Sequence, residues 1–196
     1  MFFTLHAGIP IKSTINHPSI AHHSNRLAME NTTFWTLIDA SRLAAKDDAE
    51  QQIDTLGAAV SALTPDDIVA FDRIFSEYHN RAYDWGLWGA AYLIGGGCSD
   101  DGFMDFRGWL ISRGEKVYEA ALLDPESLAD VVRDEDGDCQ VEGFQYIARQ
   151  VWQEKTGKTS KDFPKHAIAY HGDPTGTDWD EDDLETLFPK LCEKFF

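Results

Sequence analysis

Apolar residues recur at spacings of three and four along most of this chain, and most of these runs begin at a residue that can cap a helix. The clearest start is Thr64-Pro65-Asp66-Asp67, which combines a cap hydroxyl, proline at the first helical position and acid in the first turn. No segment alternates with period two, and no hairpin signal separates two apolar runs. We therefore predict an all-α fold, a single-domain multi-helix bundle.

Capping residues mark the expected helix starts, at Thr33, Asp47 or Asp48, Thr64, Ser99, Asp124 and Asp178. Asp84-Trp85-Gly86 is interpreted as a bend within a continuing helical pattern rather than an end. A long helix is expected from about Cys139 to Lys155. Pro189 is expected to break or kink the last helix.

The first residues lack any helical or strand periodicity. They also lack the basic start and long apolar core of a secretory signal. We expect residues 1–30 to form a disordered or irregular N-terminal extension and residues 31–196 to form the α-helical domain. Met29 directly precedes a helix-start pattern, which makes it a candidate first residue of the natural protein.

Charge and cysteine usage restrict the partners and the compartment. The chain has 34 acidic and 17 basic residues, a net charge of -17. This field repels phosphate backbones, so nucleic acid is an unfavourable partner, whereas a cation or a basic partner is favoured. Acid also keeps a cytoplasmic protein soluble. Cys98, Cys139 and Cys192 are odd in number and lack C-x-x-C spacing, which indicates reduced thiols and a cytoplasmic protein.

The longest run of small and apolar residues is too short for a membrane span. It extends from Trp85 to Gly97, whereas a spanning helix needs about 20 residues. We expect a buried helix there and no contact with membranes.

The stretch from Gly95 to Gly114 concentrates the most unusual chemistry of the chain. Three glycines end one helix, Ser99 can cap the next, and Asp100 and Asp101 fall in its first turn. Asp105 lies one turn after Asp101 on the same face, too far along the helix to help the cap.

These residues form the candidate ligand-binding set: Cys98, Ser99, Asp100, Asp101, Asp105 and Arg107. As a site, the carboxylates could hold a divalent cation or act as general base, beside a thiol activated at a helix N-terminus. As structure, Ser99 is a cap, the first two acids complement the helix dipole and Cys98 is a small buried residue. Arg107 and Arg113 are the candidate partners for the acids.

Three further patterns have some features of a functional site. The aromatic side chains Trp88, Tyr92 and Trp109 could line a pocket for a planar ligand or pack in the core. His166, Tyr170 and His171 fall in a late loop, where a histidine near a buried Cys or Asp could act as a base, or where all three are ordinary loop residues. The acidic run from Asp134 to Asp138 lacks the glycine and the closing glutamate of an EF-hand.

Three strings in the sequence resemble a bacterial domain family of unknown function. They are Phe-Trp-x-Leu-Ile at Phe34 to Ile38, Gly-Gly-Cys-Ser-Asp-Asp-Gly-Phe at Gly96 to Phe103, and Asp-Pro-Glu-Ser-Leu-Ala-Asp at Asp124 to Asp130. The resemblance covers roughly Thr33 to Val132 and implies no established activity.

We expect a binding or regulatory module whose ligand, a small molecule or a protein, docks near Gly96 to Arg107. The alternative is an enzyme, a hydrolase or a tailoring enzyme, that uses Asp101 and Asp105 with Cys98 or with a divalent metal. The sequence indicates no particular cofactor.

Overall fold

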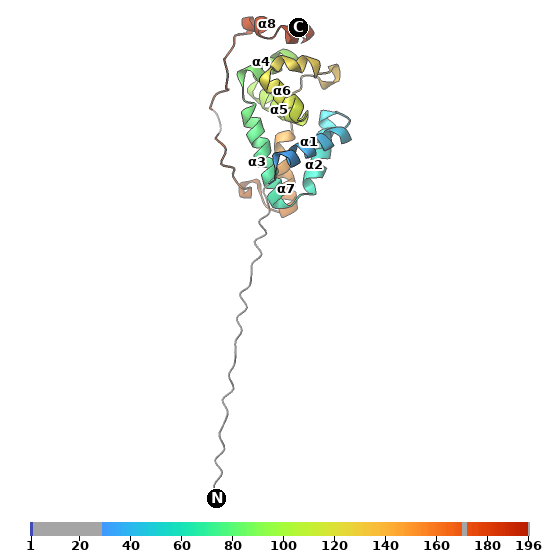
Figure 1. The fold of residues 1–196 in the computed structure, drawn as a ribbon, viewed down its shortest axis with the longest axis vertical. Coiled ribbons are helices and arrows are strands. Elements are labelled where there is room, and N and C mark those ends of the chain that lie inside the picture. Colours follow the sequence, from blue (N-terminus) through green and yellow to red (C-terminus); the bar gives the residue numbers. More distant parts are fainter. Residues whose placement is uncertain (2–28, 170–171, 196) are drawn as a thin grey trace.

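The structure of this protein is a computed structural model, which describes Met1 and residues 29–169 and 172–195. Within these residues the secondary structure is helical, without a strand, and confirms the predicted all-α class (Figure 1). Most of the predicted N-terminal extension lies outside the described residues. The α-helices are α1 (Asn31–Ala44), α2 (Ala49–Ser61), α3 (Pro65–Arg81), α4 (Trp85–Gly95), α5 (Asp100–Ser112), α6 (Glu115–Leu123), α7 (Ile147–Thr156), α8 (Leu184–Leu187) and α9 (Pro189–Phe195).

Short 3₁₀-helices connect several of these elements. They are η1 (Pro125–Asp130), η2 (Asp134–Asp136), η3 (Phe144–Tyr146), η4 (Ser160–Asp162) and η5 (Glu181–Asp183). None of the helices in the described ranges is long and apolar enough to cross a membrane.

Side-chain caps explain the starts of α2, α3, α4 and α5. The side-chain oxygens of Asp48, Thr64 and Ser99 each accept a hydrogen bond from the backbone amide three residues later, which confirms these three predicted caps. Thr33 was the wrong choice, because α1 begins at Asn31, just after Glu30. The predicted bend at Asp84 is also wrong: its Oδ1 accepts from the Gly86 amide at 2.9 Å and starts a new helix.

The predicted helix from Cys139 to Lys155 forms only in its second half. Cys139 and Gly143 have φ angles of +58° and +130°, which no α-helix tolerates, so α7 begins at Ile147. Near the C-terminus, the helix expected after Asp178 is also displaced, and α8 begins at Leu184. Pro189 breaks the pattern as predicted and begins α9.

Helix α5 is the central element of the fold. It packs against α1, α2, α3, α4 and α6. Phe103, Phe106 and Trp109 on this helix are fully buried, and each large apolar side chain removed from water contributes about 1.5–3 kcal/mol. These side chains of α5 therefore lie in the core of the protein.

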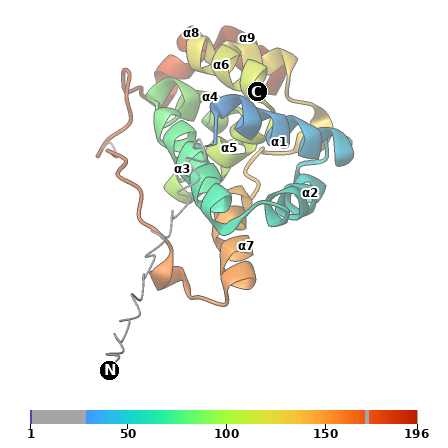
Figure 2. The same cartoon turned by 60° about the horizontal axis from the view of Figure 1, so that its bottom comes forward.

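The remaining helices enclose α5. In Figures 1 and 2, α1 and α2 form a hairpin and α3 lies beside α7. Helix α9 packs against α4 and η1. The chain after α7 passes along the outer side of α3, where the side-chain Nδ2 of Asn80 donates to the Ala169 carbonyl oxygen at 3.1 Å. Thr175 then forms a single parallel bridge with Asp84.

Two glycine-to-alanine substitutions should have opposite effects on stability. A Cβ atom on Gly102 in α5 would overlap with the Gln140 side chain, whereas one on Gly57 in α2 meets only Ile147 Cγ2 at 4.0 Å. We expect Gly102→Ala to lower the free energy of unfolding by about 1–3 kcal/mol. Gly57→Ala should raise it by about 0.5–1 kcal/mol, because alanine loses less backbone entropy. Urea denaturation of both variants checks this, and equal effects would contradict it.

Candidate functional site

The predicted cluster begins at the N-terminus of α5, where its first two carboxylates face solvent. Ser99 Oγ accepts the hydrogen bond from the Gly102 amide at 3.1 Å. Asp100 and Asp101 are exposed in the first turn, where their charge complements the helix dipole. These residues therefore agree with the structural interpretation, in which Ser99 caps the helix and the two acids complement its dipole.

The glycines of the central string make room for a side chain from the loop before α7. Gln140 Nε2 donates to the Gly97 carbonyl oxygen at 3.2 Å. A Cβ atom on Gly95 would lie 2.6 Å from Gln140 Nε2, and one on Gly102 would overlap with Gln140 Oε1. Gly96 has a φ of +63°, which lets α4 end and the chain turn toward α5. Packing against Gln140 therefore accounts for Gly95 and Gly102, and the left-handed backbone accounts for Gly96.

Asp105 is half-buried and already has an internal partner. Gln145 Nε2 donates to Asp105 Oδ1 at 2.7 Å. Burial raises the pKa of Asp105, and this effect exceeds the lowering by the Gln145 hydrogen bond; the charges of Glu142 and Asp101 add to the rise. The carboxylate expected to be available to a ligand is bonded to an amide of the same protein.

Cys98 does not have the activated thiol that an enzyme nucleophile needs. Burial raises the pKa of Cys98 to about 12, and the charges of Asp138 and Asp100 contribute to the rise. The Cys98 carbonyl oxygen accepts a hydrogen bond from Trp88 Nε1 at 3.1 Å. The position at a helix N-terminus is thus outweighed by desolvation.

Arg107 does not pair with the acids of the cluster, which corrects the expectation that it is their partner. Its guanidinium carbon lies 4.8 Å from the ring centre of Tyr83 and 5.0 Å from that of Phe103. Arg107 Nη1 donates to the His79 carbonyl oxygen at 3.0 Å. Burial lowers the pKa of Arg107 to about 10, and burial together with Arg107 lowers that of His79 to about 4.

The three candidate pocket aromatics serve the packing of the chain on itself. Trp109 is fully buried in the core. Trp88 stacks on Phe103 with ring centres 4.8 Å apart. Tyr92 Oη donates to Glu181 Oε1 at 2.6 Å, near the C-terminal segment. These contacts match the core interpretation of the aromatic series.

Metal ligands do not converge in the part of the chain that the structure describes. Within residues 29–169 and 172–195, no group of three or more His, Cys, Asp and Glu side chains could hold a metal ion. This finding includes the carboxylates of the predicted cluster and of the acidic run from Asp134 to Asp138.

His166 does find a buried carboxylate. Its Nε2 lies 2.7 Å from Asp72 Oδ2, and Arg149 Nη2 lies 3.3 Å from the same oxygen. The side chains of His166 and Asp72 are 6% and 4% exposed, so this contact holds the segment after α7 against α3. Tyr170 and His171 lie outside the described residues.

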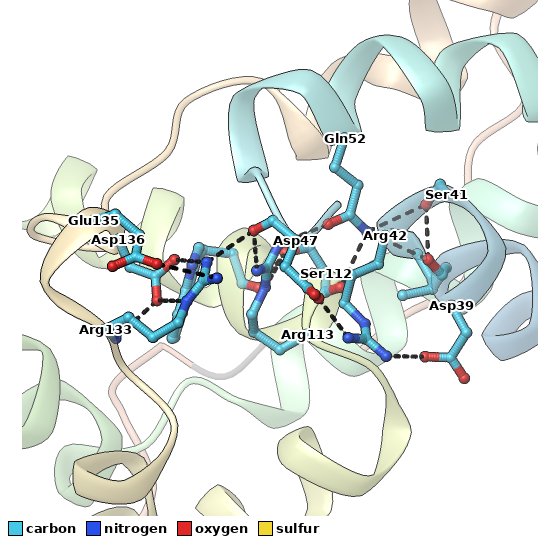
Figure 3. A network of polar contacts seen from close by, with 12 residues as sticks. Asp39, Ser41, Arg42, Asp47, Gln52, Ser112, Arg113, Arg133, Glu135 and Asp136 are labelled. Carbon is cyan, nitrogen blue, oxygen red and sulfur yellow. Dashed lines mark hydrogen bonds and ion pairs between the residues drawn. The ribbon is translucent and has the colours of Figure 1, made fainter. Parts of the chain in front are cut away.

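The most polar buried structure in the described chain is a network that the sequence did not indicate (Figure 3). Buried Gln52 in α2 is its centre. Gln52 Nε2 lies within hydrogen-bond distance of Ile38 O, Ser41 Oγ and Ser112 O, at 3.3, 3.2 and 3.0 Å. Gln52 Oε1 accepts from Arg113 Nη2 at 2.7 Å. One side chain thereby joins α1, α2 and the end of α5.

Arg113 is a buried cation that reaches only uncharged acceptors among the described residues. Besides Gln52, it donates to Ser112 Oγ at 3.1 Å and to the Asp47 carbonyl oxygen at 3.0 Å. The whole residue is 7% exposed. Burial lowers the pKa of Arg113, and the charges of Arg42 and Arg133 act in the same direction, whereas Asp136 and Asp47 oppose them.

Two further arginines flank Arg113. Arg42 Nη1 lies 2.6 Å from Asp47 Oδ1, and its Nε is buried without a partner among the described residues. Arg133 is held by both oxygens of Asp136, at 2.7 and 3.1 Å, and its Nη2 also donates to the Asp47 carbonyl oxygen at 3.1 Å. Figure 3 shows these side chains side by side.

The turn between α1 and α2 has a strained backbone at this network. Lys46 and Asp47 have φ angles of +55° and +64°, although neither is glycine. Such a residue costs on the order of 1 kcal/mol, and such conformations are common at functional sites. The turn directs the Asp47 carbonyl oxygen at Arg113 and Arg133.

Two adjoining hollows open beside the network. The walls of the first, of about 190 Å³, include Arg42, Arg113 and Arg133 together with Asp47 and Asp136. The second, of about 410 Å³, shares Arg133 and Asp136 with the first. Its other charged walls are Lys46, Asp48, Glu50 and Glu135. We call the first hollow the arginine hollow.

One signal in the sequence could have indicated part of this site. Position 113 continues the apolar stripe formed by Phe106, Trp109 and Leu110, and a cation on a buried helix face is unusual. The positions of Arg42 and Arg133 beside it follow from the tertiary structure alone.

Residues 29–154 match the family described as "Protein of unknown function (DUF4240)". No curated protein and no solved structure matches the chain. The matched range contains the whole arginine hollow and the central glycine string, whereas α8 and α9 lie outside it. The predicted resemblance to a domain family of unknown function is confirmed at this level; its bacterial origin stays a prediction.

The rate of alkylation measures how reactive the thiol of Cys98 is. Because its pKa is raised, the nucleophilic thiolate is scarce at neutral pH. We expect iodoacetamide at pH 7.5 to modify Cys98 at least about tenfold more slowly than N-acetylcysteine, followed by peptide mass spectrometry. The rate should rise as the pH approaches 12. A rate equal to that of the free thiol would contradict the raised pKa and would again favour Cys98 as an enzyme nucleophile.

The Gln52 network should be essential for stability. Gln52→Leu keeps the side-chain volume but leaves Arg113 and three oxygens short of a partner. We expect a loss of about 3 kcal/mol in the free energy of unfolding. The matched control is Gln51→Leu on the exposed side of the same helix, which should change it by less than about 0.5 kcal/mol. Similar urea midpoints for the two variants would argue against the network.

Proposed function

The chain belongs to the DUF4240 family of proteins of unknown function, and we propose that it is a binding module for a small ligand that carries an oxyanion group. The ligand's phosphate or carboxylate lies in the arginine hollow. One observation carries this proposal: Arg113 is buried in an acidic protein and, among the described residues, bonds only uncharged acceptors. A buried charge is costly unless it is paired, and an anion would supply the missing partner.

The charges around the hollow support an anion rather than a cation. Three arginines and two aspartates line it, so its walls carry an excess of positive charge. Arginine presents a planar fork of donors that matches carboxylate and phosphate oxygens. Outside the lining, Asp39 pairs with Arg42 at 3.6 Å and Glu135 with Arg133 at 3.4 Å, so Arg113 is the arginine of the three that has no carboxylate partner among the described residues.

The size of the two hollows suggests what surrounds the anionic group. Pockets for drug-sized ligands have about 300–1,000 Å³, so the arginine hollow of about 190 Å³ suits a single small group. The adjoining hollow of about 410 Å³ is lined mainly by charged side chains. It offers room for a polar remainder of the ligand, next to Arg133 and Asp136.

The docking surface expected near Gly96 to Arg107 has less support. Asp105 is bonded to Gln145, and Arg107 contacts His79 and two aromatic rings. The enzyme alternative has less support as well, because the thiol of Cys98 has a raised pKa. We therefore favour a binding module over a hydrolase or tailoring enzyme.

Titration with inorganic phosphate tests the proposal. Isothermal titration calorimetry should detect phosphate binding to the wild-type chain, and the affinity should fall as salt increases. Arg42→Gln and Arg133→Gln each remove one charged donor and should weaken binding on the order of 10- to 100-fold.

Two control variants make this result specific. Arg73→Gln removes an arginine that pairs with Glu77 on the exposed side of α3, and Asp101→Asn removes a carboxylate of the predicted cluster. Both should bind phosphate like the wild type. No binding by the wild type, or equal binding by Arg42→Gln, would refute the anion site. A change confined to Asp101→Asn would instead place the ligand near Gly96 to Arg107.

A further inference from the structure

The C-terminal segment lines a third hollow, which is separate from the arginine hollow and from its neighbour. After passing along α3, the chain bonds to the start of α4: the Trp85 amide donates to the Thr175 carbonyl oxygen at 2.8 Å. Trp179 Nε1 donates to the Trp85 carbonyl oxygen, also at 2.8 Å. The segment from Gly176 to Phe188 therefore faces α4 and η1 across a hollow of about 570 Å³.

Glycine in α4 lets the aromatic side chains of this segment approach closely. A Cβ atom on Gly89 would lie 2.7 Å from Phe188 Cε2 and 3.1 Å from Trp179 Nε1. Phe188 is buried, and the amide of Lys190 donates to Glu126 Oε1 in η1 at 2.6 Å. The C-terminal segment is thus fixed on the helical domain on both sides of the hollow.

The walls of this hollow are mostly apolar. They include Leu122, Pro125, Trp179, Leu187 and Phe188. Leu187 is 50% exposed, an unusual position for a large aliphatic side chain that nothing in the described chain covers further. The volume of about 570 Å³ falls in the range of small-molecule pockets, about 300–1,000 Å³.

The charges at this hollow are all negative. Asp84, Asp178 and Asp183 line it, and no Lys, Arg or His belongs to its described lining. Asp84 is committed to the protein, since its oxygens accept from the Gly86 amide and from Thr175 Oγ1. Asp178 and Asp183 also accept backbone hydrogen bonds, from Trp179 and Asp180, but both side chains are exposed and provide the charge at the rim.

We propose that the hollow between α4, η1 and the segment Gly176 to Phe188 binds an organic cation with an apolar body and one ammonium group. The apolar body packs against Trp179, Leu187 and Phe188, and the ammonium group lies at the rim near Asp178 and Asp183. Apolar burial supplies most of the affinity, and the rim carboxylates select the charge of the ligand. This site is separate from the arginine hollow, and either proposal can fail without the other.

Three probes of one shape and different charge test the site. They are 4-phenylbutylamine, 4-phenylbutanol and 4-phenylbutyrate, measured by isothermal titration calorimetry against the full chain. We expect the amine to bind best and the carboxylate worst. Exposed ion pairs are weak, so each rim carboxylate should account for about a 1.4- to fivefold difference between amine and alcohol.

Variants at exposed positions separate the two contributions. Asp183→Asn should weaken amine binding about 1.4- to fivefold and leave alcohol binding unchanged. Leu187→Asn should weaken both probes alike. The matched control is Asp130→Asn, an exposed carboxylate outside the lining, which should bind all three probes like the wild type.

Three outcomes would overturn this inference. The first is that none of the probes binds to the wild-type chain. The second is that the amine and the carboxylate bind equally well. The third is that Asp130→Asn weakens amine binding as much as Asp183→Asn does, because a general effect of net charge would then explain the preference.

Discussion

The buried amide of Gln52 determines how the helices meet at the arginine hollow. Arg113 has donors only, so it requires the oxygen of this amide, and the nitrogen must then face the oxygens of α1 and of Ser112. A single side chain thereby fixes α1, α2 and the end of α5 relative to one another. This arrangement also holds Arg113 in place, although its guanidinium has no hydrogen bond to a carboxylate among the described residues.

The acidic character of the chain makes these arginines informative. A net charge of -17 disfavours anions at long range, so an anion would have to be held by short-range contacts with Arg42, Arg113 and Arg133. The hollow beside the C-terminal segment has the opposite chemistry, with apolar walls and carboxylates at its rim. The two sites would accept ligands of opposite charge, and only the first lies wholly within the matched family range.

Features that depend on neighbouring residues were predictable from the sequence. Asp48, Thr64 and Ser99 cap their helices because a cap needs only the next turn of backbone. The helix predicted across Gly143 was wrong, although its apolar residues have helical spacing. Gln140 holds this segment as a loop through its bond to Gly97, which is far away in sequence and which the local pattern does not reveal. The arginine hollow was missed for the same reason: distant segments bring its cations together. Gln140 fills the space that Gly95 and Gly102 leave, and this contact between distant segments was also not predictable from the sequence.

The most direct test of the central claim is the NMR signals of the arginine side chains during titration with phosphate. The account predicts that the Nε–H resonances of Arg42, Arg113 and Arg133 shift together and saturate, whereas that of Arg73 stays in place. If saturating phosphate leaves the Arg113 resonance unchanged, the buried guanidinium is satisfied by the protein alone, and the anion-binding function is contradicted.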